Sequence, residues 1–252
     1  MSILKVEGLK KIYKSKIGLV QYSALKNINF EVDEGEFLGI MGPSGSGKTT
    51  LLNILGTIDK CSSGNIILGD KNLSNLNKKE MSAYRRENIG FIFQDYNLLN
   101  TLTVKENIIL PLVLNKESIS KMDSLLKEIT NDLMIADILH KYPYEISGGQ
   151  QQRVATARAV ISKPRIILAD EPTGNLDSKS SKELLDMLTI LNTNYKSTIL
   201  MVSHDPYATS YCNRVIFIKD GELYNEIFRG LNRKDFYDKI INTLASIGGE
   251  RQ

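Results

Sequence analysis

Two spacings of apolar residues run along the chain, and together they predict a mixed α/β protein. Residues 3–9 and 24–32 alternate apolar and polar positions, which is typical of strands with one wet face. Residues 64–70 predict a short strand closed by a turn, and residues 214–224 predict a hairpin around Asp220-Gly221. Continuous apolar runs, typical of buried strands, occupy 37–41, 89–93, 165–171 and 197–202.

Between these strands the apolar residues recur at helical spacing. The first turns of a helix are expected at 50–55, a polar helix at 78–86, and further helices at 147–160, 178–191 and 234–247. Pro164 ends the third of these, and Asp177 or Ser178 caps the fourth. Residues 104–138 predict a helical insertion, broken at 115–118, whose apolar stripe is Ile108, Leu112, Leu125, Leu126, Ile129, Leu133 and Ile138. Strands that alternate with helices favour a mostly parallel sheet.

Composition narrows the class of protein. Apolar residues make up 42% of the 252 residues, enough for a large core, and the net charge is only +3. Lys and Arg are spread along the chain, so a dedicated nucleic-acid surface is not indicated, although it is not excluded. Cys61 and Cys212 match no metal spacing; we expect two core residues in a reducing cytoplasm. With no signal peptide and no apolar run of about 18 residues, a membrane role must come through a partner.

One stretch is predicted to bind phosphate. It is Gly42-Pro43-Ser44-Gly45-Ser46-Gly47-Lys48-Thr49, followed by Thr50. It fits the pattern G-x-x-x-x-G-K-[ST] between a buried strand and a helix, where backbone N–H groups and the helix N-terminus hold phosphate. Lys48 can reach the β- and γ-phosphates, and the Thr49 hydroxyl can bind Mg²⁺. A flexible glycine turn is the alternative interpretation.

Polar side chains follow three of the other buried strands. Asp170 and Glu171 close one strand; Asp170 fits a Mg²⁺ ligand, and Glu171 fits the base that polarises the attacking water. His204 follows another and can donate to a γ-phosphate, while Gln94 follows a third and can touch Mg²⁺ or the nucleophilic water. The alternatives are a solvated turn for the acidic pair and a structural role for His204, as we expect for His140.

The order of these features resembles the ATP-binding subunit of ABC transporters. The phosphate loop, Gln94, Asp170-Glu171, Asp177 and His204 occur in that family's order, and the resemblance covers residues 3 to about 224. Its most diagnostic stretch is Ile146-Ser147-Gly148-Gly149-Gln150-Gln151-Gln152-Arg153, which is similar to the family's signature motif.

The resemblance implies roles that spacing alone does not supply. Tyr13 would stack on adenine, Gln94 would sense Mg²⁺ and touch a membrane partner, and Asp177 would lie at a dimer interface. Glu171 would be the catalytic base and His204 the γ-phosphate switch. Ser147, Gly148, Gly149 and Gln150 would cap ATP bound to the opposite subunit, so two copies would clamp two ATP molecules head to tail. Helix N-terminal N–H groups beside a serine suit such an anion site.

The resemblance also implies an architecture: a phosphate-loop nucleotidase core with an N-terminal antiparallel β-subdomain and an inserted helical subdomain. We expect one ATP-binding domain over 1–252. Residues about 1–94 and 163–228 would form the core and β-subdomain, about 95–162 the helical subdomain, and about 229–252 a C-terminal helix.

Several stretches resemble one subgroup, the ATPases of bacitracin and antimicrobial-peptide resistance. Residues 171–177, Glu-Pro-Thr-Gly-Asn-Leu-Asp, occur in the wider subgroup that also serves lipoprotein release and macrolide export. Residues 94–99 and 203–207 look most like the bacitracin type. The resemblance implies a homodimer at the cytoplasmic face of the membrane, a permease partner and, in some members, a two-component sensor kinase.

Other functions stay open at this point. The chain could serve lipoprotein release or macrolide export, or could transmit mechanical force without transport. A soluble ABC ATPase acting on DNA or ribosomes fits poorly, because such chains are longer. Residues 95–102 are a candidate docking surface for the permease, with ordinary packing of the helical subdomain as the alternative.

Overall fold

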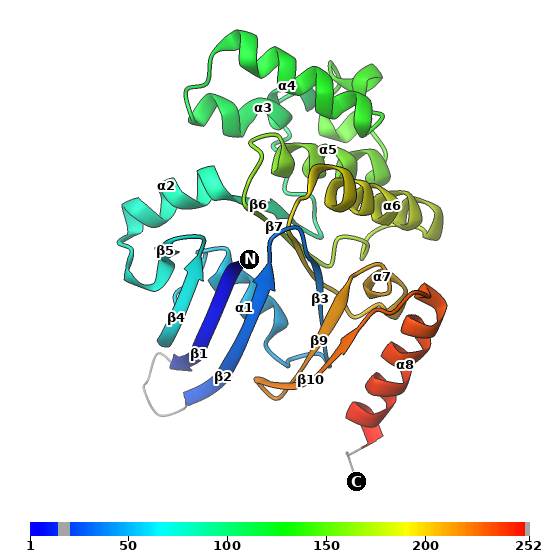
Figure 1. Ribbon diagram of the computed structural model, residues 1–252. Helices are drawn as coiled ribbons and strands as arrows, with labels where there is room; N and C mark the ends of the chain where they lie inside the picture. Colours follow the sequence, from blue (N-terminus) through cyan, green and yellow to red (C-terminus); the bar gives the residue numbers. More distant parts are fainter. Residues whose placement is uncertain (15–20, 250–252) are drawn as a thin grey trace. The chain divides into compact units, whose positions relative to one another are not determined.

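The computed structural model describes residues 1–14 and 21–249, which form two compact units (Figure 1). The first unit comprises Met1–Ser82 and Thr198–Gln252, and the second comprises Ala83–Ser197. The last three residues of the predicted C-terminal helix, 250–252, lie outside the described residues. The predicted division into core, helical subdomain and C-terminal helix stays a prediction.

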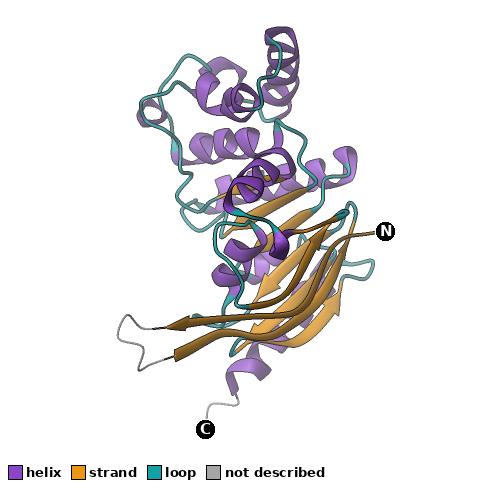
Figure 2. Ribbon diagram, turned by 90° about the vertical axis from the view of Figure 1, so that its left-hand side faces the viewer, coloured by secondary structure: helices purple, strands orange, loops and turns teal. Residues whose placement is uncertain are grey.

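An antiparallel sheet in the first unit has the strand order β2-β1-β4-β5 (Figure 1). Its strands are β1 (Ser2–Lys14), β2 (Gln21–Asp33), β4 (Ser63–Leu68) and β5 (Lys71–Asn72). Figure 2 draws these strands in orange together with those of the other sheet. In β2, Ile28, Phe30 and Val32 are buried while Asn29 and Glu31 between them are exposed, which confirms the predicted strand with one wet face.

A second sheet in the first unit has the order β10-β9-β3-β8, with strands β3 (Phe37–Met41), β8 (Ile199–Val202), β9 (Arg214–Lys219) and β10 (Glu222–Phe228). β3 runs parallel to both β8 and β9, and all five of its residues are buried, as its apolar run predicts. β9 and β10 form the predicted hairpin, whose turn residues Asp220 and Gly221 both have positive φ. The helices are α1 (Lys48–Leu55), η1 (Leu73–Asn75), α7 (Pro206–Thr209) and α8 (Arg233–Gly249).

The helix α2 (Lys78–Asn88) leads from the first unit into the second, which is mainly helical. Two parallel strands, β6 (Ile89–Ile92) and β7 (Ile166–Asp170), run side by side there. Its other elements are α3 (Val104–Leu114), α4 (Ile119–Asp132), η2 (Ala136–Ile138), η3 (Pro143–Glu145), α5 (Gly148–Val160) and α6 (Ser178–Tyr195). The helical insertion is therefore confirmed, and its break falls at 115–118, where Ser118 caps α4.

Several details differ from the sequence predictions. The first strand continues to Lys14, five residues beyond the predicted end at Leu9. Leu125 is only half-buried, whereas the other six members of the predicted stripe are buried. The helix α6 continues four residues beyond 191 and ends where Lys196 adopts a left-handed conformation. The short helix α7 was not predicted, because four residues are too few to show a helical period.

The predicted α/β fold class is confirmed. The described residues form parallel and antiparallel sheets, and helices connect many of the strands. Cys212 is buried, as expected for a core residue, and Cys61 is half-buried. Within residues 1–14 and 21–249, every helix is too short or too polar to cross a bilayer.

Candidate functional site

The phosphate loop joins β3 to α1 in the first unit, and its backbone requires glycine at two positions. Gly42 has φ +153° and Gly47 has φ +105°, both in the region that disfavours other residues. A Cβ on Gly42 would lie 2.0 Å from the Ile218 carbonyl oxygen, and one on Gly47 would lie 2.5 Å from the Ala24 carbonyl oxygen. The loop is therefore held against its neighbours in a shape that a side chain would disrupt.

The polar groups of this loop suit an anion. Gly47 is the N-cap of α1 and no side chain caps this helix, so its first-turn N–H groups are available to a ligand. Lys48 is buried, and its Nζ donates to the carbonyl oxygens of Gly42 (2.8 Å) and Pro43 (2.9 Å). The buried Ser46 hydroxyl has no hydrogen-bond partner among the described residues. A phosphate oxygen would satisfy these groups, so the loop fits the phosphates of a nucleotide.

Tyr13 lies in β1, and its ring is held from two sides while 42% of the side chain stays exposed. Its hydroxyl donates to Asp59 Oδ2 (2.8 Å), and Lys11 Nζ lies 4.6 Å from the ring centroid. Lys11 Nζ also donates to Asp59 Oδ1 (2.7 Å). Partial burial and the bond to Asp59 raise the pKa of Tyr13. Burial alone would raise the pKa of Asp59, but the hydrogen bonds from Lys11 and Tyr13 outweigh it and lower that pKa.

Asp59 and Lys11 were missed as supports of Tyr13. Lys11 and Tyr13 are two apart in a strand and so share a face, which is a signal the sequence does carry. Asp59 is 46 residues from Tyr13, and nothing in the local pattern indicates their contact. The result is an exposed aromatic face on a fixed support, which suits stacking on a base.

His204 leaves the sheet of the first unit at the same edge as the phosphate loop. Ile40 of β3 is paired with Val202 of β8 in a parallel register, and the Ser203 N–H donates to the Ile40 carbonyl oxygen (3.2 Å). Met41 and Val202 therefore end neighbouring strands, and the chain continues into Gly42 after one and into Ser203 and the exposed His204 after the other. Carboxyl ends of parallel strands are where α/β proteins bind ligands.

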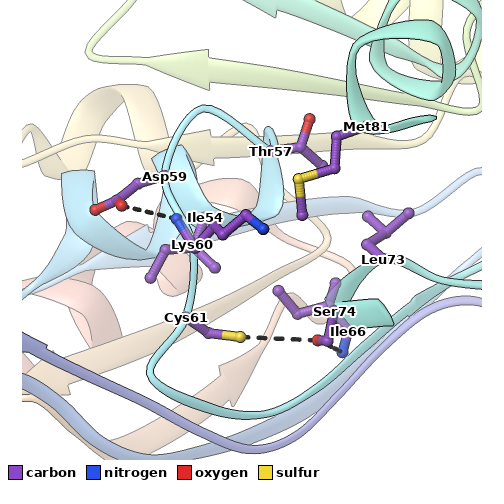
Figure 3. A pocket seen from close by; sticks show the side chains of 9 residues that line it. All are labelled: Ile54, Thr57, Asp59, Lys60, Cys61, Ile66, Leu73, Ser74 and Met81. Atoms are coloured by element: carbon purple, nitrogen blue, oxygen red, sulfur yellow. Dashed lines mark hydrogen bonds between the residues drawn. The ribbon is translucent and has the colours of Figure 1, made fainter. Parts of the chain in front are cut away.

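A small pocket in the first unit lies at the C-terminal end of α1. It has a volume of about 50 Å³ and is lined by nine residues, Ile54, Thr57, Asp59, Lys60, Cys61, Ile66, Leu73, Ser74 and Met81 (Figure 3). The Cys61 sulfur points toward the Ser74 hydroxyl at 3.8 Å. Ligand pockets are typically several hundred Å³, so this one is too small for a nucleotide.

In the second unit, the acidic pair and Gln94 leave neighbouring parallel strands. Ile92 of β6 is paired with Ala169 of β7, so both strands deliver polar residues at one edge. Asp170 and Glu171 are half-buried, and Glu171 has φ +46°, an uncommon conformation for this residue. Strained backbone of this kind gathers at functional sites.

Asn175 connects Gln94 to the segment that follows the acidic pair. Its amide nitrogen donates to the Gln94 carbonyl oxygen (3.2 Å) and to Asp95 Oδ1 (2.9 Å), and Gln94 Nε2 donates to Asn175 Oδ1 (3.3 Å). A Cβ on Gly174 would lie 2.9 Å from Gln94 Nε2. The amide of Gln94 is therefore oriented by residues 80 positions later in the chain.

The signature stretch begins helix α5 and is capped from within. The Ser147 hydroxyl accepts from the Gln150 N–H (3.3 Å), and Gln150 Oε1 accepts from the Ser147 N–H (3.0 Å), which is a capping box. Positions Gly148 and Gly149 leave room for two neighbours, because added Cβ atoms would lie 2.9 Å from the Tyr96 hydroxyl and from Ser180 Oγ respectively.

Asp177 caps α6 and is tied to the signature stretch through Ser180. Its Oδ1 accepts from the N–H groups of Lys179 and Ser180 (both 2.9 Å), and Oδ2 accepts from the Ser180 hydroxyl (3.0 Å). The bonds from Ser180 lower the pKa of Asp177. Each unit thus gathers its own part of the predicted site. The first holds Tyr13, the phosphate loop through Thr50, and His204; the second holds Gln94, Asp170, Glu171, Asp177 and residues 147–150.

Comparisons with known proteins agree on one family. The family model described as ABC transporter matches residues 25–174. The ABC transporter ATP-binding protein YxdL of Bacillus subtilis is 54% identical over 248 residues, 98% of this chain and 95% of that protein. The bacitracin export ATP-binding protein BceA of Halalkalibacterium halodurans is 50% identical over 250 residues, 99% and 98% of the two chains. The second similarity confirms the predicted resemblance to the bacitracin subgroup.

A solved structure is similar over most of the chain. It is a dimer of the ATP-binding cassette MJ0796, a protein of Methanocaldococcus jannaschii, in a post-hydrolysis state bound to ADP and Pi. The TM-score is 0.82 with 39% identity, covering 90% of this chain and all of that one. The chain belongs to the ABC transporter family and is an ATPase of the ATP-binding cassette type.

Proposed function

We propose that this chain is the ATP-hydrolysing subunit of an ABC transporter that protects against, or exports, antimicrobial peptides of the bacitracin type. Two copies close head to tail around two ATP molecules and drive a membrane permease from the cytoplasmic face. The observation that carries the proposal is the phosphate loop, whose α1 helix lacks a side-chain cap and whose Ser46 hydroxyl is buried without a partner among the described residues.

Within each copy, each of these residues has its own role in binding or hydrolysing ATP. The loop N–H groups and Lys48 bind the β- and γ-phosphates, and the Tyr13 ring stacks on the adenine. Glu171 accepts a proton from the attacking water, and His204 donates a hydrogen bond to the γ-phosphate. Thr50 follows the loop in the first turn of α1 and is the last residue of the phosphate-binding segment.

Thr49, Gln94 and Asp170 are the Mg²⁺ ligands in this proposal. A hydroxyl, an amide oxygen and a carboxylate are the hard oxygen donors that this ion prefers. When bound, Mg²⁺ neutralises charge on the phosphates. The two strand-end residues, Gln94 and Asp170, share one edge of the second unit's strand pair.

The signature stretch serves the partner copy. Ser147 and the N–H groups of Gly148 and Gly149 begin a helix of 13 residues, where the helix dipole favours an anion. Asp177 lies beside it through Ser180, so both belong to the surface that meets the second copy. The dimeric MJ0796 cassette is an example of such an assembly in a relative.

The permease and the peptide substrate follow from the relatives rather than from this chain's own chemistry. The relative BceA is described as a bacitracin export protein. This chain would act on its partner from the cytoplasmic face of the membrane, with residues 95–102 as the docking surface. A sensor kinase is a further candidate partner.

Replacing Glu171 by glutamine tests the proposal. The variant should bind ATP and form a stable dimer, while the kcat for ATP hydrolysis falls about 100-fold or more, because a positioned base contributes that much. Hydrolysis is measured by phosphate release, and dimer formation by size-exclusion chromatography with ATP. Glu87→Gln, at an exposed position of α2, is the matched control and should keep wild-type turnover.

Two results would contradict parts of the proposal separately. Undiminished turnover of the Glu171→Gln variant would exclude Glu171 as the base. A variant that binds ATP without ever dimerising would exclude the head-to-tail clamp.

A further inference from the structure

The C-terminal helix α8 packs against α7, the short helix that follows His204 (Figure 1). Both belong to the first unit. Phe236, Ile240 and Ile247 form the buried face of α8. Asn232 fixes its start, since Asn232 Oδ1 accepts from the Lys234 N–H (2.9 Å). The beginning of α8 is thus held at a defined place on the unit.

Two arginines at this beginning contact α7 and the residues after it. The Arg233 guanidinium carbon lies 4.2 Å from the Tyr211 ring centroid and 5.8 Å from that of Tyr207. Arg229 Nη1 donates to the Tyr211 carbonyl oxygen (2.8 Å). The two tyrosines meet edge to face, and their hydroxyls are 3.0 Å apart. Tyr211 is 5% exposed and Tyr207 is 36% exposed, so the cation lies over one buried ring and near one exposed ring.

The other end of α7 is joined to His204. The next residue, Asp205, caps α7 by accepting from the Tyr207 N–H (2.8 Å), and its own N–H donates to Ser203 Oγ (3.0 Å). His204 therefore lies between Ser203, whose N–H is bonded to β3, and Asp205, which caps α7. A shift of α7 would therefore act on His204 through Asp205, the residue that follows it.

The same helix contacts the strand that leads into the phosphate loop. Thr209 Oγ1 lies 2.9 Å from the Met41 sulfur and 3.1 Å from the Asp205 carbonyl oxygen, and Met41 immediately precedes Gly42. A Cβ on Gly39 would lie 3.4 Å from Thr209 Cγ2, so α7 and β3 approach closely. The helix α7 thus links α8, His204 and the strand before the phosphate loop.

A helix of four residues has no stability of its own, because helix nucleation is unfavourable. Its buried residues Ala208 and Thr209 pack into the first unit, and the arginines of the C-terminal segment contact Tyr207 and Tyr211. We propose that Arg229 and Arg233 are positioning residues that hold α7, and through it His204, in the orientation required for hydrolysis. This inference rests on the proposed role of His204.

Arg233→Gln tests the inference in the full-length protein. We expect kcat for ATP hydrolysis to fall about two- to fivefold with KM unchanged, the size expected for one cation–π contact. Arg233→Lys keeps the charge over the rings and should recover part of the loss. Lys234→Gln removes the same charge from the next position and should behave as wild type. Thermal unfolding of each variant checks that the fold is retained.

A double variant separates this inference from the function of His204 itself. If His204→Ala leaves kcat unchanged, the proposed role of His204 is wrong. If His204→Ala slows hydrolysis but Arg233→Gln does not, the role of Arg233 is wrong. The inference expects Arg233→Gln to add no further loss in the His204→Ala background. An equal loss in both backgrounds would show that Arg233 acts by another route and would overturn it.

Discussion

Two helix N-termini in this molecule are proposed to bind phosphate, and they are built in opposite ways. Helix α1, after the phosphate loop, begins at Gly47 and has no side-chain cap. Helix α5, after the signature stretch, begins at Ser147 and is closed by a reciprocal capping box with Gln150. The first leaves its N–H groups to a ligand, whereas the second satisfies two of them from its own side chains.

The difference indicates how strongly each helix depends on nucleotide. The phosphate loop also contains an unpartnered buried hydroxyl at Ser46, with Lys48 turned back onto the loop carbonyls, so bound phosphate would complete it. The capping box of the signature helix occupies the N–H groups of Ser147 and Gln150, so fewer groups are left for an anion and the helix gains less from one. This agrees with a tight site within one copy and a weaker contact that forms only when a second copy closes.

The largest expected effect comes from blocking the weaker contact. Ser147→Arg places a bulky side chain where the partner's nucleotide would lie, so we expect turnover to fall by at least about 100-fold. ATP binding to the isolated monomer should stay intact, because the phosphate loop is unchanged. Both are measured on one preparation, by phosphate release and by titration with a fluorescent ATP analogue.

A matched control uses another N-cap serine of the second unit. Ser118 caps α4 and accepts from the Lys121 N–H, so Ser118→Arg removes a cap of the same kind. It should leave turnover near wild type. Full activity of Ser147→Arg, or equal losses in both variants, would refute capping by the signature helix.

The next largest effect is a loss of stability when alanine replaces a glycine in the phosphate loop or in the signature stretch. Gly42→Ala would push a Cβ to 2.0 Å from a backbone oxygen at positive φ, so we expect it to lower the free energy of unfolding by about 2–4 kcal/mol. A Cβ on Gly149 would lie 2.9 Å from Ser180 Oγ and 3.2 Å from Ser180 Cβ, which are side-chain rather than backbone atoms, so we expect a smaller loss of about 1 kcal/mol. Urea unfolding measures both. Equal destabilisation would show that the two helix starts are similarly constrained.

Much of this contrast was predictable from the sequence, because the deciding features are local. Four apolar residues around Gly39 at 37–41 predict a buried strand, and the glycine spacing after it predicts the phosphate loop. Ser147 three residues before Gln150 is a capping-box pattern. The roles of Glu171 and His204 at the active site stay predictions.

The supports of the candidate site were not predictable, since they join residues distant in sequence. Asp59 holds Tyr13 across 46 residues, and Asn175 orients Gln94 across 81. Helix α7 has start signals in Asp205 and Pro206, but it is too short to show a period. The contact of Arg233 with Tyr211 depends on where α8 packs, which no local pattern specifies.

The smallest expected effect is a difference in acid sensitivity between the two regions. Bonds from Ser180 lower the pKa of Asp177 from its ordinary 3.8 in the folded protein. A depressed folded pKa contributes stability that is fully present above the ordinary value and is lost as pH falls through the folded value. Asp177→Asn should therefore lower the urea midpoint at pH 7, and the gap to wild type should narrow below about pH 4.

The start of α1, which has no acidic residue in its first turn, should contribute nothing to this change. Asp238→Asn, at an exposed position of α8, controls for the loss of one surface carboxylate, and a gap of constant size down to pH 3 would refute the assignment.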